Sequence, residues 1–326
     1  MKTDARSTSG PRANDEPGHA RDLAVRASWL YHVEGLTQQQ VAEAIGISRA
    51  RIARLLAAAL DEGIVSIRIG ARSGERIALE RRLIARYGLD DAFVAPGSAD
   101  EAGAADVVGA AAATFLREQA RDGMSIGVGW GATLSAAARV LEPRPLRGAS
   151  VISLLGGMTH SRGVNPSAVA RRVADAFAAD CYQLTAPLVV ADARVRDALW
   201  AEPALRALRQ RASKAGLALV SVGEVSARAT LFRERVLPAD TLESLRAAGA
   251  IADVLGRFVD AHGRPIAHAV NERVVAVDVA DLRRVPRFVV ASGGERKVDA
   301  LRAALAAVRV HVLITDEPAA RGLLER

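Results

Sequence analysis

Cysteine, lysine and long apolar runs are scarce in this 326-residue chain, and the scarcity of cysteine and of apolar runs excludes several classes of protein. The single cysteine, Cys181, excludes an internal disulfide and a cysteine-based metal site. The six histidines are scattered without the spacing of metal ligands, so we expect no metal. No apolar run reaches the ~18 residues that span a bilayer, and the N-terminus lacks the core of a signal peptide. We therefore expect a cytoplasmic protein without a membrane segment.

Lysine occurs only at positions 2, 214 and 297, so the net charge of +7 comes almost wholly from arginine. Residues 1–70 contain nine Lys/Arg and eight Asp/Glu, which leaves nearly all of the excess in the rest of the chain. A basic chain is compatible with a nucleic-acid partner, but the charge alone does not establish one. Half of the residues are hydrophobic, which is enough for two domains with a sizeable core.

Residues 36–60 have the pattern of a helix-turn-helix. Thr37 is a favoured N-cap, and Gln40 completes a capping box for the first helix. Gly46 can adopt the left-handed conformation that ends a helix, and Ser48 is a second N-cap. The apolar stripe of the second helix consists of Ile52, Leu55, Leu56 and Ala59.

Arginines near the start of that second helix lie off its apolar stripe, where they suit the major groove of DNA. We expect phosphate contacts from the first helix, and both phosphate and base contacts from the second. The predicted DNA-contacting residues are Thr37, Gln38, Gln39, Ser48, Arg49, Arg51 and Arg54. The alternative is two helices of an ordinary helical core with solvated arginines.

The flanking segments complete a small N-terminal domain. Residues 1–20 are polar and rich in Gly, Pro, Ser and charge, so we expect them to be disordered. Residues 21–34 predict a packing helix, and residues 64–69 alternate like a short strand, which suggests a wing. Residues 70–74 are typical of a hinge. The predicted domains are residues 1–20 (tail), 21–69 (DNA-binding) and 70–326 (effector binding and oligomerisation).

From residue 75 onward, strand-like apolar runs alternate with alanine-rich helical runs, often across a glycine-rich loop. This repeat is the pattern of an open, mostly parallel α/β sheet. The expected strands are residues 92–95, 124–128, 151–155, 217–222, 287–291 and 310–314. The expected helices are residues 75–87, 104–119, 134 onward, 167–179, 297–308 and 317–324.

Three glycine-rich loops follow strands of this predicted sheet, at the edge where open α/β folds bind ligands. The first is residues 127–133, the second contains Gly156-Gly157 and leads to Asn165, and the third is residues 292–297. Glycines let the backbone approach a ligand closely, and the hydroxyl of Thr133 lies near a helix N-terminus.

The third loop is the most informative, because Arg296 and Lys297 stand in the first turn of the following helix. Cations there oppose the helix dipole, and an anion bound by the amides and the cations would reverse that cost. A lysine in a chain that otherwise uses arginine indicates a point-charge phosphate binder. The alternative is a solvated helix start.

The first loop also fits a loose G-x-G-x-x-A dinucleotide fingerprint. That fingerprint requires an acidic residue at the end of the next strand, which instead ends in Leu154-Leu155-Gly156-Gly157. An oxidoreductase is therefore disfavoured, and we expect no cofactor. Asp253 lies beside small residues and could either hold sugar hydroxyls or cap a helix, and the sequence leaves both roles open.

These pieces together resemble the SorC family of sugar-binding transcriptional regulators, with a DeoR-like helix-turn-helix and a sugar-binding domain. The resemblance covers nearly everything after residue 20. It is carried by LTQQQVAEAIGISRARIARLL, GVGWGATL, LLGGM, VNPSAVARRVA, GAIADVLGRFVD, VASGGERKVDALRAAL and LITDEPAARGLL. The resemblance implies a helix-turn-helix joined to a Rossmann-like effector domain related in fold to sugar-phosphate isomerases. It also implies an oligomer, a tetramer or dimer, that binds operator DNA and responds to a sugar, polyol or sugar phosphate.

The resemblance further implies an effector site, in which Asp253 would contact hydroxyls and Gly293, Gly294 and Lys297 would hold a phosphate. The implied effector-binding residues are Gly129, Gly131, Thr133, Gly156, Gly157, Asn165, Asp253, Gly293, Gly294 and Lys297. No catalytic residue is implied.

The expected function is therefore a DNA-binding regulator of a sugar or polyol catabolism operon, controlled by a carbohydrate or phosphorylated carbohydrate. One alternative is an isomerase-like enzyme with a DNA-binding head, although no carboxylate pair, histidine dyad or Lys–acid pair stands out at the glycine loops. The other alternative is a constitutive DNA-binding protein whose large domain only oligomerises.

Overall fold

The structure is a computed structural model that describes residues 17–61, 64–65, 74–98, 101–161 and 164–325. By its internal contacts the chain divides into two compact units, residues 1–71 and 72–326, and each is described by itself. Among the described residues, no helix combines the length and hydrophobicity of a membrane span.

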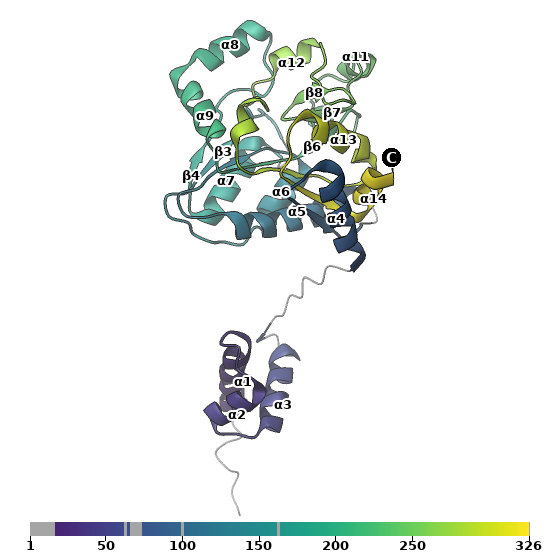
Figure 1. The fold of residues 1–326 in the computed structure, drawn as a ribbon. Helices are drawn as coiled ribbons and strands as arrows, with labels where there is room; N and C mark the ends of the chain where they lie inside the picture. Colours follow the sequence, from purple (N-terminus) through teal and green to yellow (C-terminus); the bar gives the residue numbers. More distant parts are fainter. Residues whose placement is uncertain (1–16, 62–63, 66–73, 99–100, 162–163, 326) are drawn as a thin grey trace, which may run out of the picture. The chain divides into compact units, whose positions relative to one another are not determined.

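The first unit contains the three helices α1 (Pro17–His32), α2 (Gln38–Ile45) and α3 (Arg49–Asp61), shown in Figure 1. The predicted capping box is confirmed, because the Gln40 amide donates to Thr37 Oγ1 at 3.3 Å and the Thr37 amide donates to Gln40 Oε1 at 2.9 Å. Gly46 ends α2 with φ +79°, as predicted. The small core of this unit consists of Ala27, Val41, Ala42, Ile52 and Leu56.

Local details of the first unit differ from the sequence prediction. Helix α1 begins at Pro17, four residues earlier than expected, and ends at His32, two residues earlier than expected. The buried residues of α2 are Val41 and Ala42. Of the predicted wing, only Ile64 and Val65 are described, and they form a bend; the rest lies outside the described residues.

The second unit is built on a seven-stranded sheet with the order β1-β10-β9-β5-β2-β3-β4, in which every pairing is parallel. The strands are β1 (Asp91–Ala95), β2 (Ser125–Val128), β3 (Ser150–Ser153), β4 (Asp180–Tyr182), β5 (Leu217–Val220), β9 (Phe288–Ala291) and β10 (Val312–Asp316). After β2 the chain moves outward to β3 and β4, and β5 then returns to the other side of β2. The order of strands therefore reverses between β2 and β5, which is where such sheets bind ligands.

Helices cover both faces of this sheet (Figure 1). One face packs against α5 (Glu101–Gln119), α6 (Ala132–Val140) and α7 (Pro166–Phe177). The other packs against elements that include α4 (Gly74–Tyr87), α9 (Pro203–Ser213), α13 (Val298–Ala307) and α14 (Glu317–Glu325). The predicted parallel α/β fold is confirmed, and burial on both faces explains why the strands are continuous apolar runs.

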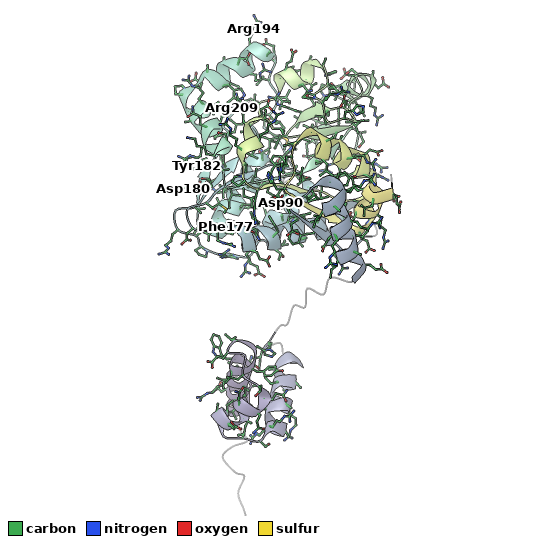
Figure 2. The ribbon with its side chains drawn as sticks, in the orientation of Figure 1. Asp90, Phe177, Asp180, Tyr182, Arg194 and Arg209 are labelled. Atoms are coloured by element: carbon green, nitrogen blue, oxygen red, sulfur yellow. The ribbon has the colours of Figure 1, made fainter. Side chains whose placement is uncertain are left out.

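A side chain of α9 stacks on the edge strand β4. The guanidinium of Arg211 lies 4.1 Å from the centroid of the Tyr182 ring. Arg209, on the same helix, pairs with Asp281 through its Nε at 2.5 Å. Figure 2 shows Tyr182 and Arg209 on these two elements.

Shorter elements were not predicted. A small antiparallel sheet of β6 (Val222–Glu224), β7 (Ala252–Val254) and β8 (Arg257–Val259) follows β5, because the expected strand 217–222 breaks at Ser221 and continues in a different sheet. The expected strand 310–314 lies two residues later, since β10 pairs with β1 up to Asp316. The other unpredicted elements are α8 (Ala193–Ala201), α10 (Thr230–Arg233), α11 (Thr241–Ala247), α12 (Ala269–Arg273) and the 3₁₀ turns η1 (Asp281–Arg284) and η2 (Glu295–Lys297), besides β4 and α9.

Gly156, just beyond β3, is closely enclosed by backbone. Its amide donates to the Val275 carbonyl at 2.9 Å. A Cβ atom at this position would lie 2.6 Å from the Ala186 oxygen and 2.7 Å from the Pro187 oxygen. Only glycine lets these two segments cross without moving the main chain.

We therefore predict that Gly156→Ala destabilises the second unit by ~1–3 kcal/mol, because an added methyl group must displace backbone atoms. The matched control is Gly157→Ala, whose Cβ would lie 3.4 Å from the Asn165 side-chain oxygen and meet no backbone. Urea unfolding of both variants measures the difference, and equal midpoints for the two would contradict the assignment.

Candidate functional site

A cavity of about 920 Å³ opens at the carboxyl ends of β2, β5 and β9, where the strand order reverses. We call it the sheet-edge cavity. It is lined by the segments that follow those three strands, by α10 and the loop before it, and by β7. Five of the residues predicted from the sequence line it, namely Gly131, Thr133, Asp253, Gly293 and Lys297.

The first glycine loop brings the N-terminus of α6 to the cavity. Gly131 is the N-cap residue, with φ +112°, a conformation that side chains rarely allow. It provides no side-chain cap, and the first turn of α6 lines the cavity through Ala132 and Thr133. Thr133 in that first turn is 1% exposed and lines the cavity. Gly129 does not line it, since this residue permits close approach to β5, where a Cβ would lie 3.3 Å from Val220 Cα.

Asp253 is a buried acidic residue of β7 and caps no helix. Its Oδ1 accepts the Gly256 amide at 3.0 Å. Its Oδ2 fills the place of a side chain on the neighbouring strand, because a Cβ at Gly223 would lie 1.6 Å away. Burial raises the pKa of Asp253 to about 6, while the Gly256 hydrogen bond and the charge of Lys297 act in the opposite direction.

Lys297 also lines the cavity and lies next to the small antiparallel sheet that contains Asp253. Its ammonium donates to the Val222 carbonyl at 3.1 Å and to Ser292 Oγ at 3.4 Å. The sequence placed Lys297 in the first turn of a helix, but residues 295–297 form a 3₁₀ turn and α13 begins at Val298. Lys297 is therefore the N-cap residue of α13.

The two glycines of the third loop have different surroundings. Gly293 lines the cavity, and a Cβ there would lie 2.7 Å from Val108 Cγ2 and 2.9 Å from the Asp316 carboxylate. Gly294 does not line it, because its amide donates to both carboxylate oxygens of Asp316, at 2.9 and 3.0 Å. That amide already has a protein acceptor.

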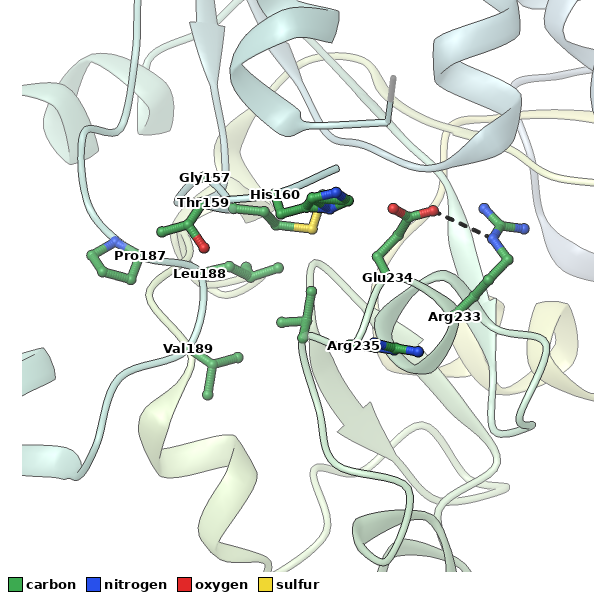
Figure 3. Close-up of a pocket in the computed structure, with 11 residues that line it drawn as sticks. Gly157, Thr159, His160, Pro187, Leu188, Val189, Arg233, Glu234 and Arg235 are labelled. Atoms are coloured by element: carbon green, nitrogen blue, oxygen red, sulfur yellow. Dashed lines mark hydrogen bonds and ion pairs between the residues drawn. The ribbon is translucent and has the colours of Figure 1, made fainter. Parts of the chain in front are cut away.

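Of the second glycine loop, only Val164 lines the sheet-edge cavity among the described residues. Asn165 caps α7 through Ser167 and donates to the Met158 carbonyl at 2.8 Å, so both ends of its amide bind protein. Gly157 lines a separate cavity of about 950 Å³ (Figure 3), and Gly156 is enclosed by backbone. The structure thus does not bring Gly156, Gly157 and Asn165 to the sheet-edge cavity.

Several residues of the sheet-edge cavity were missed from the sequence. Its charged lining has an excess of cations: Arg139, Arg172, Arg228, Arg233 and Lys297 against Asp106, Glu224 and Asp253. Arg139 is already paired with Asp106 at 2.9 Å. The chain contains so many arginines that none of these carried a signal. Gly223, which creates the space for the Asp253 carboxylate, could have been suspected from its position after a strand.

In the first unit, the predicted DNA-contacting residues lie on α3 and at the start of α2. Arg49 and Arg54 are exposed, and Arg51 is half-buried. Ser48 Oγ accepts the Arg51 amide at 3.3 Å, which confirms its capping role. The Thr37 hydroxyl donates to the Gln40 side chain, and the side-chain amide of Gln39 donates to the Glu43 carboxylate at 2.9 Å.

Comparison with known proteins agrees with this architecture. Residues 72–325 match the Sugar-bind family, which is described as a sugar-binding domain. The erythritol catabolism regulatory protein EryD of Brucella abortus is 35% identical, with 93% of this chain and 96% of the relative covered. The deoxyribonucleoside regulator of Bacillus subtilis is 33% identical, with 93% and 97% covered.

Solved structures show the same fold. The full-length sorbitol operon regulator SorC from Klebsiella pneumoniae superposes with a TM-score of 0.70 at 23% identity, covering 94% of this chain and 99% of that one. A domain of a possible sugar-binding transcriptional regulator from Arthrobacter aurescens TC1 gives a TM-score of 0.70 at 28% identity, covering 79% and 100%. With its helix-turn-helix unit and its matching second unit, the chain belongs to the SorC family of sugar-binding transcriptional regulators.

Proposed function

We propose that the protein controls transcription by binding operator DNA with its first unit, and that a sugar phosphate bound in the sheet-edge cavity sets the operator affinity. The observation that carries this proposal is the pairing of Asp253 and Lys297 in one cavity. A buried carboxylate is a strong acceptor for sugar hydroxyls, and an ammonium is a point-charge partner for phosphate.

The rest of the lining supports an anionic ligand. Cationic side chains outnumber anionic ones around the cavity. The first turn of α6 adds backbone amides and the Thr133 hydroxyl, a suitable environment for phosphate oxygens. Asp253 would bind hydroxyls at one side of the ligand, and Lys297 with Gly293 would hold the phosphate at the other. Gly129, Gly156, Asn165 and Gly294 are assigned structural roles instead, and Gly157 lines the second cavity.

The names of the relatives support the class of ligand. One is a regulator of erythritol catabolism and another a deoxyribonucleoside regulator, so we infer a small sugar, polyol or phosphorylated derivative for this chain. The relatives are regulators rather than enzymes, and we assign no catalytic role to the cavity.

On the DNA side, we propose that Arg49, Arg51 and Arg54 reach phosphates and base edges, with Ser48 and Thr37–Gln39 placed at the backbone. Helix-turn-helix proteins bind two half-sites as pairs, so we propose a homo-oligomer, a tetramer or dimer. Binding to chromosomal operators places the protein in the cytoplasm. The ligand would act by its different affinity for two arrangements of the oligomer.

A thermal-shift panel of triose to hexose phosphates, with the matching free sugars and polyols, tests the ligand. Ligand at ~100 times its Kd should add ~2.7 kcal/mol to the free energy of unfolding of the full-length protein. Lys297→Met should weaken binding of the sugar phosphate at least ~10-fold, since one charge-assisted contact is worth about 1.4 kcal/mol or more. It should leave the affinity of ligand-free protein for a duplex selected from a random pool unchanged.

Arg51→Ala is the matched control and should do the reverse, weakening the selected duplex by ~1–3 kcal/mol while the ligand binds as before. If Lys297→Met bound the sugar phosphate as tightly as the wild-type protein, Lys297 would not be the phosphate-binding residue. Thermal shifts with free polyols alone would contradict the same assignment. A panel without any hit would favour the constitutive DNA-binding protein.

A second prediction concerns pH. Since the pKa of Asp253 is raised to about 6, its carboxyl is mostly protonated at pH ~5 and ionised at pH ~7 in the ligand-free protein. Ligand hydroxyls favour the ionised form, so affinity should rise with pH through this range, by up to ~10-fold per pH unit. Asp253→Asn should keep only the smaller rise that comes from the ligand phosphate, whose second pKa is ~6. Parallel pH profiles by calorimetry would show that Asp253 does not bind the ligand.

The raised pKa of Asp253 also affects the stability of the fold, which should fall as the pH rises, whereas the ligand affinity should rise. The unfolded chain releases the Asp253 proton near pH 3.8, whereas the folded protein keeps it to about pH 6. The free energy of unfolding should therefore fall as the pH rises between these values, and this fall should be absent from Asp253→Asn.

A further inference from the structure

One buried carboxylate fastens a wall of the sheet-edge cavity to a helix outside it. Asp316, the last residue of β10, is 1% exposed. It accepts the Gly294 amide with both oxygens, at 2.9 and 3.0 Å, and its Oδ1 also accepts the Ala319 amide at 3.2 Å. The carboxylate therefore joins the third glycine loop to the first turn of α14.

The loop side of this connection lies directly against the cavity. Gly293, just before Gly294, and Lys297, the last residue of the 3₁₀ turn, both line it. No side chain fits between Gly293 and the Asp316 carboxylate, because a Cβ at Gly293 would lie 2.9 Å from Asp316 Oδ1. A change in the position of this loop must therefore move the carboxylate or break its hydrogen bonds.

The far side of α14 is tied to α4 by three contacts. The Tyr87 hydroxyl donates to the Leu323 carbonyl at 2.9 Å, and Arg86 donates to the Leu324 carbonyl at 3.2 Å. Arg321 pairs with Glu75 at 3.1 Å. The two helices lie side by side (Figure 1).

Helix α4 is also the first helix of the second unit, directly after the segment that leads from the DNA-binding helices. It is held to the sheet by a second buried carboxylate, since Glu80 accepts the Val94 amide of β1 at 2.8 Å. β1 in turn pairs with β10 up to the register Ala95–Asp316. Asp316 is thus connected to α4 both through α14 and through the sheet.

We propose that Asp316 is a positioning residue that transmits occupancy of the sheet-edge cavity to α4, and through α4 to the DNA-binding unit. This inference rests on the proposed function, because it assigns the route by which the bound ligand changes operator affinity. A buried carboxylate that accepts hydrogen bonds from amides of two segments fixes the position of one segment relative to the other. A ligand that prefers another position of the loop shifts that arrangement.

The test measures coupling separately from binding. For the full-length protein we would determine the affinity for the selected duplex without ligand and with a saturating amount of the sugar phosphate that stabilises it most. We call the quotient of these two duplex affinities the coupling ratio. In the wild-type protein the ratio should lie in the usual range of about 5- to 150-fold. Asp316→Asn keeps the shape of the side chain but loses its charge and half of its acceptors. The ratio should fall below ~2-fold, while the affinity for the sugar phosphate changes less than ~3-fold.

A second variant acts far from the cavity. Tyr87→Phe removes only the hydroxyl that binds Leu323, and it should also lower the ratio. The matched control is Asp281→Asn, which breaks the Arg209 pair on α9 and η1 and should leave the ratio at its wild-type value. Glu80 and the cavity residues stay intact in all three variants.

Hydrogen exchange of the ligand-free proteins gives a readout that needs no ligand. In Asp316→Asn, amides of α4 and α14 should exchange faster, and those of α9 should not. Wild-type ratios in both Asp316→Asn and Tyr87→Phe, or unchanged exchange in α4, would overturn the proposal. A wild-type protein that responds to no sugar phosphate would instead contradict the proposed function, so the two failures are distinguishable.

Discussion

The buried carboxylate of Asp253 is the constraint on which the sheet-edge cavity depends. One of its oxygens fills the space of a side chain at position 223, so that position must be glycine. Lys297 and the Gly256 amide supply the charge and the hydrogen bond that a carboxylate needs away from water. Three segments from distant parts of the chain are therefore held together around a single negative charge. A cavity built in this way is already charged and polar before any ligand arrives, which reduces the reorganisation that binding requires.

The helix-turn-helix and the long strands could be predicted because their signals are local. Thr37, Gln40 and Gly46 each specify one hydrogen bond or one backbone conformation, and the structure has all of them. The short strands β6–β8 gave no usable alternation over three residues each. Helix α8 has no buried residue, so its sequence carries no apolar stripe to recognise. Arginine is so common that the four arginines of the cavity lining could not be told from solvated ones.

The candidate site was predictable only in part, because glycine serves two purposes that look alike in a sequence. Gly131 leaves room beside the cavity, which is the role expected of all the loop glycines, and Gly293 both lines the cavity and leaves room for the Asp316 carboxylate. Gly129, Gly156 and Gly294 are instead required by neighbouring protein: a strand, two crossing carbonyl groups and a carboxylate. Both purposes select the smallest residue. The positions of β5, of the Ala186 and Pro187 carbonyl groups and of Asp316 separate the two purposes, and none of them is visible without the fold.

The pairing of β1 with β10 also has a consequence for how the protein is made. Among the described strands β1 is synthesised first, but its partner β10 lies about 220 residues later. At ~5–20 residues per second, β1 and α4 wait roughly 10–45 s for the strand and the helix that cover them. The DNA-binding helices have no such wait, since their contacts are local. The nascent chain thus acquires its DNA-binding unit long before the connection from α4 to the cavity is closed, and that connection is completed only by the final residues.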